Sequence, residues 1–322
     1  MIRKVVLLIL CVSSLLATVR YAPAQTAKEP CSPAIRFWKL LNGVQISNRG
    51  ILRLGEFYAV CLPEPARQSS SNYPFDPDDG GKLSTLVKKS DGQTLATYVW
   101  YAENVSTLWV MNRFKVIGGP SAIKPLEPGN YVLEFAIEDK PFYRFPFSVS
   151  MAKSDDAYNP GDLYFLDGLW SEYGGLYYPN VNRYLQFNVW LRARGKPKRE
   201  GTQYELKLIR ESDGKVIAED AGPNAAVSLK PEWNQYKLSF RPIKNEASTD
   251  ASYEFKASEL LKSDGKYVVR LSLDGALYGE YPFTVKSGKI EYQGNQSRES
   301  ATPLMYIEDG NNSYWIKRRA AR

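Results

Sequence analysis

The chain contains no histidine among its 322 residues, and this absence excludes several kinds of chemistry. A Ser-His-Asp triad and a Cys-His nucleophile pair both need an imidazole as general base. Zinc, iron and copper sites with histidine ligands are excluded for the same reason. The sequence also lacks a glycine-rich phosphate-binding loop. We therefore expect a non-enzymatic protein that carries no cofactor.

Long apolar runs are also absent once the N-terminal segment is set aside. Residues 1–24 combine basic residues, an apolar stretch and the small-x-small sequence Ala22-Pro23-Ala24. These features predict a secretory signal peptide that is cleaved from the exported protein. No later run approaches the roughly 18 apolar residues of a membrane helix, so no membrane span is expected. The predicted location is the periplasm or the outside of the cell.

Cysteine is scarce, with three residues in the whole chain. Cys11 lies in the predicted signal peptide, which leaves Cys31 and Cys61 in the exported protein. An even pair of cysteines in an exported protein predicts a disulfide. The wide spacing without a neighbouring ligand residue argues against a redox or metal pair.

The positive charge of the chain is confined to its two ends. The formal net charge is +7, and residues 1–24 contribute three of these charges. The last six residues contribute the other four, through Lys317, Arg318, Arg319 and Arg322. The remaining body is neutral, so nucleic-acid binding through a basic face is not indicated. The basic tail is interpreted as a solvated terminus, or else as a contact for an anionic surface or partner.

A short passage of this chain occurs twice. Residues 129–149 align without a gap with residues 265–285, so that GNYVLEFAI matches GKYVVRLSL and FPFSV matches YPFTV. A second pair of passages, LVKKSDG at 86–92 and LIRESDG at 208–214, precedes the first in each copy. Two landmarks in the same order indicate one type of domain that is used twice.

Apolar and polar residues alternate through most of the sequence. In the passage that begins at Tyr131, every second side chain up to Ile137 is apolar, and the passage that begins at Tyr267 repeats this pattern. Asp-Gly pairs stand between such runs, and they supply the backbone conformation of tight hairpins. The pattern predicts half-buried antiparallel strands, and therefore an all-β fold.

The Gly-x-Tyr sequence before each penultimate strand resembles the tyrosine corner of immunoglobulin-like β-sandwiches. The Pro-Phe-x-Val strand that follows resembles their closing strand. This resemblance of architecture implies two tandem immunoglobulin-like antiparallel β-sandwich domains, at residues 25–152 and 153–287. The boundary near residues 151–160 is interpreted as a hinge. Residues 288–322 are predicted to form a polar linker, a terminal hairpin outside both repeats, and the basic tail.

Aromatic residues crowd the segment that opens the second repeat, between Tyr158 and Phe187. Rings with polar tips suit a wet protein interface or a platform on which sugars stack. The alternative is that they pack the contact between the two domains. The candidate sugar-binding residues are Trp170, Tyr173, Tyr177 and Tyr178.

Trp190 provides a second candidate site. The alternation of its strand places Phe187, Val189 and Leu191 on one face, and Trp190 with Arg192 on the other. Tryptophan and arginine are enriched at binding hot spots. The alternative is that the C-terminal hairpin, or the longer middle of the second repeat, covers this face. The predicted partner-binding residues are Trp190 and Arg192, together with Tyr314 and Trp315 of the hairpin.

Acidic residues offer weaker patterns. Residues 76–81, DPDDGG, resemble the start of a calcium loop, but Val87 stands where the bidentate glutamate is needed. This segment is interpreted as a turn, so no metal site is predicted. A cluster of carboxylates near the boundary is interpreted as linker and turns, in place of a glycosidase pair. Its members are Asp155, Asp156, Asp162, Asp167 and Glu172.

Together these patterns favour an exported, non-catalytic binding or assembly module. Its expected partner is another exported or envelope protein. The alternatives are a carbohydrate-binding protein of the cell wall or extracellular matrix, with a glycan as its partner, and a pilus-type periplasmic chaperone. A hydrolase that uses carboxylates is the last alternative.

Overall fold

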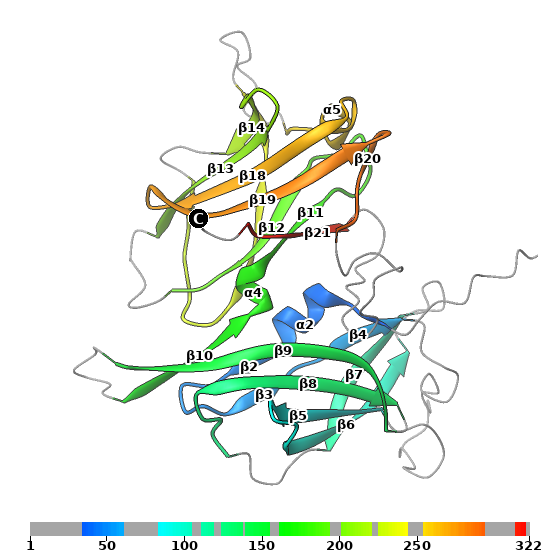
Figure 1. Cartoon of the computed structure of the whole chain (residues 1–322), viewed down its shortest axis with the longest axis vertical. Coiled ribbons are helices and arrows are strands. Elements are labelled where there is room, and N and C mark those ends of the chain that lie inside the picture. The colour runs from blue at the N-terminus through cyan, green and yellow to red at the C-terminus, as the bar shows by residue number, and fades with distance from the viewer. Residues whose placement is uncertain are drawn as a thin grey trace, which may run out of the picture. The chain divides into compact units, whose positions relative to one another are not determined.

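The computed structural model of this chain is built mainly of β-strands, and every strand pairing in it is antiparallel. The predicted all-β class is therefore confirmed (Figure 1). The predicted signal peptide and the two cysteines of the predicted disulfide lie outside the described residues. The structure describes residues 34–60, 83–104, 111–118, 124–137, 139–154, 161–193, 201–220, 225–243, 254–293 and 313–319.

The first half of the chain builds one sheet of eight strands. Its strands are, in their order across the sheet, β1 (Ala34–Ile35), β4 (Phe57–Val60), β7 (Met111–Gly118), β6 (Thr94–Asn104), β5 (Leu83–Lys89), β8 (Gly129–Ile137), β9 (Lys140–Lys153) and β10 (Asp162–Gly168). Helix α2 (Phe37–Gly43) and the hairpin of β2 (Val44–Ile46) and β3 (Leu52–Leu54) contribute side chains to the same buried core. Because β5 pairs with both β6 and β8, the hydrogen-bonded ladder is continuous and does not divide into two sheets.

The second half contains two sheets that share a core. The first has the order β16 (Asn234–Ser239), β12 (Gln186–Leu191), β11 (Tyr173–Tyr177) and β21 (Ser313–Lys317). The second has the order β17 (Arg241–Pro242), β14 (Val216–Asp220), β13 (Thr202–Arg210), β18 (Gly265–Leu273), β19 (Ala276–Lys286) and β20 (Lys289–Ile290), with β15 (Ala226–Val227) on β13. Phe187 and Val189 of the first sheet lie in one buried cluster with Leu208 and Val269 of the second. This half is therefore sandwich-like.

The sequence repeat is also a repeat of structure. The hydroxyl of Tyr131 donates a hydrogen bond of 2.6 Å to the carbonyl four residues upstream, and that of Tyr267 donates an equivalent bond of 2.8 Å. Tyr131 stacks on Phe147 with ring centroids 5.5 Å apart, and Tyr267 stacks on Phe283 at 5.7 Å. The aligned tyrosines and phenylalanines thus make the same contacts in both copies.

The chain leaves the first sheet later than the predicted boundary at residues 151–160. β10 pairs with β9 from Asp162 opposite Lys153 to Gly168 opposite Phe147, so it belongs to the first sheet. Gly168 then turns the chain with a φ of 125°, a region that residues with a side chain rarely adopt. The short helix α4 (Leu169–Glu172) follows and leads directly into β11.

The C-terminal strand pairs with a strand of the second half. β21 pairs with β11, Tyr173 lying opposite Lys317, and it forms an edge of the four-stranded sheet. The other strand of the predicted hairpin lies outside the described residues. Tyr314 and Ile316 belong to the core of the second half, whereas Trp315 belongs to the core of the first. A strand with apolar residues on both faces is stable only when both faces are covered.

One ion pair occurs in both copies of the repeat, with the acidic and the basic residue interchanged. Glu134 on β8 lies opposite Arg144 on β9, and at the aligned positions Arg270 lies opposite Glu280. Glu134 is only 3 % exposed, and its carboxylate accepts bonds from Lys88 at 2.5 Å and Arg144 at 2.8 Å. Burial by itself would raise the pKa of this carboxyl group. The hydrogen bonds and charges of the two cations outweigh burial, and the pKa lies below its usual value of 4.5.

We predict that Glu134→Gln lowers the free energy of unfolding at pH 7 by about 1 to 3 kcal/mol, because it removes a buried charge-assisted contact. Because the pKa of Glu134 is lower in the folded chain, its carboxylate stabilises the fold at pH values above the pKa of the unfolded chain. This stabilisation is lost as the pH falls through the folded-state pKa. The difference between variant and wild type should therefore shrink in acid, measured by urea unfolding across the pH range. The control Glu205→Gln removes an exposed pair with Lys207 and should cost less than about 1 kcal/mol. Equal losses in both variants would contradict the prediction.

Candidate functional site

Four of the eight predicted binding residues come together in one aromatic cluster, which we call the aromatic junction. It joins side chains of the first half of the chain to side chains of the second half. Trp315 meets Phe37 edge-on at 4.8 Å between ring centroids, and Trp190 lies 5.4 Å from Trp315. The junction comprises Phe37, Phe145, Trp170, Tyr173, Trp190, Trp233 and Trp315.

The alternation of strands β12 and β21 places the tryptophans in the junction. On β12, Phe187 and Val189 face the core of the second half, while Trp190 between two such residues faces the other core. On β21, Ile316 faces the core of the second half and Trp315 faces the core of the first half. The sheet that contains these strands is therefore covered on both of its faces.

Three tryptophans of the junction donate their indole N–H groups to acceptors in the first half of the chain. Trp170 donates to the carbonyl oxygen of Leu41 at 2.7 Å, and Trp190 donates to Oδ1 of Asn42 at 2.8 Å. Both acceptors belong to α2. Trp233 donates to the carbonyl oxygen of Leu166 on β10 at 2.6 Å. Buried indoles need such partners, so these bonds fix α2 and β10 against the junction.

Arg192 is held beside the junction. Its guanidinium group contacts the carboxylate of Asp167 at 2.9 Å. The same group lies over the rings of Phe165 and Trp233, at 4.6 and 5.1 Å from their centroids. Only 5 % of the Arg192 side chain is exposed. A cation in this position ties the end of β12 to β10.

The burial of these residues argues against their predicted role as an exposed contact. Trp190 is 0 % and Trp315 3 % exposed, so neither ring offers surface to a partner. The expectation that Trp190 and Arg192 form an exposed pair is wrong. The alternative holds in part, because Trp315 of the C-terminal segment packs on Trp190.

The four predicted sugar-binding residues do not form an exposed platform. Trp170 and Tyr178 are buried, and Tyr173 is half-buried with its ring 5.7 Å from that of Phe37. Tyr177 is half-buried on β11. Stacking of sugars needs several open and coplanar rings, and these rings are used for packing.

Three tyrosines outside the junction form a second feature, which we call the tyrosine stack. Tyr314 lies between Tyr178 and Tyr292, with ring centroids at 5.9 and 5.2 Å. The hydroxyl groups of Tyr178 and Tyr314 are 3.1 Å apart and share a hydrogen bond. Burial comes first and this bond second among the causes that raise the pKa of Tyr314, so it stays protonated at neutral pH. Tyr292 is 51 % exposed and is a residue that the sequence patterns did not indicate.

The tyrosine stack borders a shallow hollow of about 890 Å³ in the second half of the chain. Val181, which is 46 % exposed, lies on its wall. Lys286 and Lys289 line the same hollow, and Lys286 is 3.9 Å from Glu291. The hollow thus combines an apolar floor with a charged edge.

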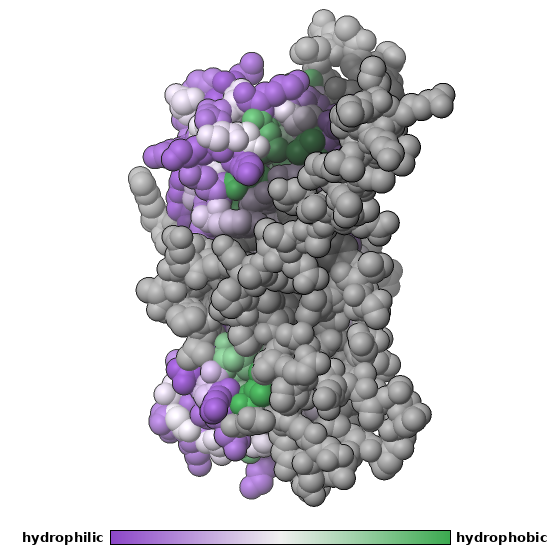
Figure 2. Space-filling view, turned by 90° about the vertical axis from the view of Figure 1, so that its right-hand side faces the viewer, coloured by the Kyte–Doolittle hydropathy of each residue, from purple (hydrophilic) through white to green (hydrophobic). Residues whose placement is uncertain are grey.

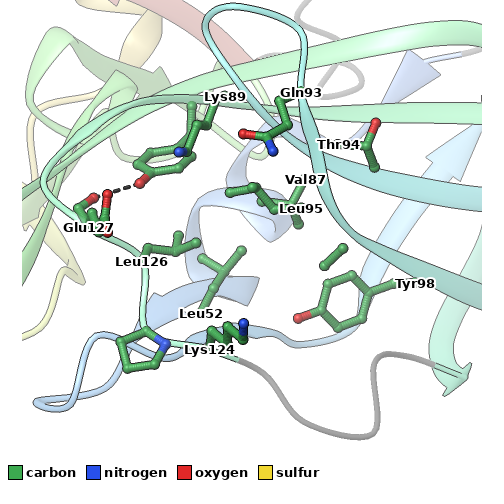
Figure 3. Close-up of a pocket in the computed structure, with 13 residues that line it drawn as sticks. Leu52, Val87, Lys89, Gln93, Thr94, Leu95, Tyr98, Lys124, Leu126 and Glu127 are labelled. Atoms are coloured by element: carbon green, nitrogen blue, oxygen red, sulfur yellow. Dashed lines mark hydrogen bonds between the residues drawn. The ribbon is translucent and has the colours of Figure 1, made fainter.

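A deeper pocket of about 430 Å³ lies in the first half of the chain (Figure 3). Leu52, Val87 and Leu126 supply apolar walls, and Lys89 and Lys124 also line it. Its residues come from β3, β5, β6 and the segment before β8, which are distant in sequence. No motif could have joined them before the fold was known.

The described carboxylates of the boundary cluster are paired with cations. Asp162 contacts Lys153 at 2.6 Å, and Glu172 contacts Lys317 at 3.4 Å. Asp167 contacts Arg192 as described above. Asp155, Asp156 and residues 76–81 lie outside the described residues. Within the described ranges, no group of three or more acidic or cysteine side chains is placed to hold a metal ion.

The basic tail is bound to the protein over the part that is described. The guanidinium of Arg318 lies 5.4 Å from the ring centroid of Tyr278. Arg319 contacts Glu211 at 2.6 Å and Glu280 at 3.2 Å. Arg318 and Arg319 therefore contact the protein, while Lys317 remains exposed and Arg322 lies outside the described residues. These contacts hold the end of β21 against the second sheet.

The described surface has few large exposed apolar side chains. On the face that Figure 2 shows, the coloured residues carry limited green areas among hydrophilic ones. None of the helices that the structure describes has the length and apolar character needed to cross a membrane. The large apolar residues that are exposed are Leu95, Met151, Val181, Ile243, Leu277 and Tyr292.

Comparison of the chain with family models, with curated proteins and with solved structures found no match.

We predict that Trp190→Ala lowers the free energy of unfolding by about 3 to 5 kcal/mol, because it opens a cavity in the junction. In wild type, both halves should unfold in one transition, because the junction packs side chains from both halves in a single cluster. Urea unfolding followed by tryptophan fluorescence and by circular dichroism measures both quantities. Leu277→Ala, at a position that is 60 % exposed, is the control and should change stability by less than about 0.5 kcal/mol. Two separate transitions in wild type would refute a shared core.

We also predict that a chain ending at residue 312 does not fold to a soluble protein. The truncation removes β21, which uncovers the edge of β11 and deletes Trp315 and Ile316 from two cores. Soluble yield and circular dichroism measure the outcome. Lys317→Ala in the full chain, where that side chain is 63 % exposed, is the control and should leave the yield unchanged. A folded and monomeric truncated chain would show that β21 is dispensable.

Proposed function

We propose that this chain is an exported, non-catalytic binding protein that consists of two immunoglobulin-like β-sandwich halves. Its proposed partner is another exported or envelope protein. The export of the chain rests on the signal-peptide pattern of residues 1–24.

The immunoglobulin-like assignment is supported by a bond that both halves make. The hydroxyls of Tyr131 and Tyr267 each bind the carbonyl four residues upstream, which is the hydrogen bond of a tyrosine corner. The two sheets of the second half, packed on one core, suit the same architecture. The first half departs from it through its continuous eight-stranded sheet. We therefore propose it as a modified copy of the same domain.

The non-catalytic assignment is supported by the side chains that would have to perform catalysis. The chain has no histidine, so an acid or base would have to be a carboxylate, a lysine or a tyrosine. A general acid needs a carboxyl group whose pKa is raised by an apolar site. Asp162, Asp167 and Glu172 each form an ion pair with a lysine or an arginine, so none of them lies in an apolar site.

The observation that carries the protein-binding proposal is the tyrosine stack with its exposed end. Tyr292 presents half of its surface to solvent beside Val181. Tyrosine is enriched at the centre of protein interfaces, where a few large side chains supply most of the binding energy. Lys286, Lys289 and Glu291 around the hollow supply the polar rim that such interfaces have. Tyr314, a predicted partner-binding residue, lies directly beneath Tyr292.

The alternatives have less support. The rings that would stack sugars are buried or half-buried, apart from Tyr292. A pilus-type chaperone needs paired basic residues that anchor the end of a subunit, and no such pair was identified in the sequence. The protein-binding function therefore fits the described surface best.

The test is site-specific crosslinking in the native host, with a photoreactive phenylalanine at position 292 or at position 277. Leu277 is the matched control, because it is also exposed and lies at the opposite end of β19. A discrete adduct with one protein from position 292, and none from position 277, is the expected result. Tyr292→Ala should weaken co-purification of that protein by about 30-fold, which corresponds to a hot-spot contribution of about 2 kcal/mol. No adduct at 292, or the same adducts at both positions, would refute the proposal.

A further inference from the structure

The pocket in the first half of the chain lies beside the segment that precedes Gly129. In the second half, the segment before Gly265 forms helix α5 (Ala257–Leu261), and its Leu260 and Leu261 are buried in the core. In the first half, the described residues before Gly129 begin at Lys124 and form no helix. The first copy leaves a pocket of about 430 Å³ beside this segment.

The pocket contains a buried hydroxyl group without a hydrogen-bond partner. Tyr98 is only 5 % exposed, and its hydroxyl makes no hydrogen bond to any residue that the structure describes. Figure 3 shows the ring of Tyr98 directed into the pocket from β6. Buried polar groups in proteins are almost always paired, and leaving one unpaired is unfavourable. A group that enters the pocket would satisfy it.

The second half differs at the equivalent position. Asp220 is aligned with Tyr98, and its carboxylate accepts a bond of 2.6 Å from Tyr204. The second half also has a buried hydroxyl without a partner among the described residues, that of Tyr281. An unpaired hydroxyl alone therefore does not indicate a ligand, and what distinguishes Tyr98 is its position on the wall of the pocket.

The charges around the pocket favour an anion. Lys89 and Lys124 line it, and neither forms an ion pair with any described residue. Glu127 is the single acidic residue among the lining side chains, so the balance is positive by one charge. Burial raises the pKa of Tyr98, which keeps its hydroxyl protonated as a hydrogen-bond donor.

The rest of the lining is apolar. Leu52, Val87 and Leu126 are buried and form the inner walls, and Leu95 lies among the exposed lining residues. A volume of about 430 Å³ falls in the range of small-molecule sites, which are mostly apolar with a few placed polar groups. The pocket thus offers an apolar interior, one donor and a positive edge.

We propose that this pocket binds a small amphipathic monocarboxylate. The apolar chain of the ligand lies against Leu52, Val87 and Leu126. The carboxylate accepts the hydrogen bond of the Tyr98 hydroxyl and is balanced by Lys89 and Lys124. This site is separate from the tyrosine stack, and it stands whether or not that surface binds a protein.

Calorimetric titration of the purified protein with decanoate, and with decanol as its uncharged counterpart, tests the proposal. Tyr98→Phe removes only the hydroxyl and should weaken decanoate binding by about tenfold or more, as for a hydrogen bond to a charged group. Its melting temperature should be no lower than that of wild type, because the hydroxyl has no partner to lose. This second measurement separates loss of binding from loss of fold.

The double variant Lys89→Gln/Lys124→Gln should weaken decanoate binding and leave decanol binding unchanged. Lys266→Gln, an exposed lysine of the second half, is the matched control and should alter neither. Absence of decanoate binding up to millimolar concentration would overturn the proposal. So would decanoate binding that both Tyr98→Phe and the double variant leave intact, or decanol binding as tightly as decanoate.

Discussion

The structure depends on the burial of one four-stranded sheet on both of its faces. Trp190 and Trp315 cover one face of β12 and β21, and Val189 and Ile316 cover the other. β11 lies between these strands and carries Gly174 and Gly175. A Cβ atom at Gly174 would come within 2.3 Å of the Phe187 ring, and one at Gly175 within 3.4 Å of the Trp315 ring. Gly174 thus lets the Phe187 ring lie against the backbone, where a side chain would clash, and the Trp315 ring lies over Gly175 at ordinary van der Waals distance. The first half has to supply the cover for the second face.

Much of the fold follows from local patterns in the sequence. The period of two predicts the strands, and the gap-free repeat predicts that Tyr131 and Tyr267 have the same role. A period of two reports only which residues share a face, and it does not report what covers that face. The partner of Trp190 on α2 is Asn42, which is 148 residues away. Trp190, which the alternation placed on the outer face of its strand, is therefore buried in the fold, and so is Trp315.

The candidate sites were harder to predict, for a related reason. The pocket is defined by packing that is missing, and a sequence records the side chains present and not the space between them. Tyr98 resembles any other strand aromatic until its neighbours are known. Tyr292 follows the closing strand in a polar stretch and shares no pattern with Tyr178 or Tyr314. The alignment of the two copies nevertheless marks the region of the pocket, because Tyr98 stands where the second copy has Asp220.

Duplication explains how such a departure is tolerated. A folded domain has a net stability of only about 5 to 15 kcal/mol, and an unpaired buried hydroxyl costs about 1 to 3 kcal/mol of it. A small domain folding alone would lose a large share of its margin in this way. Here the first copy shares the aromatic junction with the second, and three buried indoles with their hydrogen bonds stabilise both. The second copy keeps its core filled by α5. The first copy is therefore free to keep a pocket with an unsatisfied donor, which a ligand of matching chemistry would stabilise by binding the folded state alone.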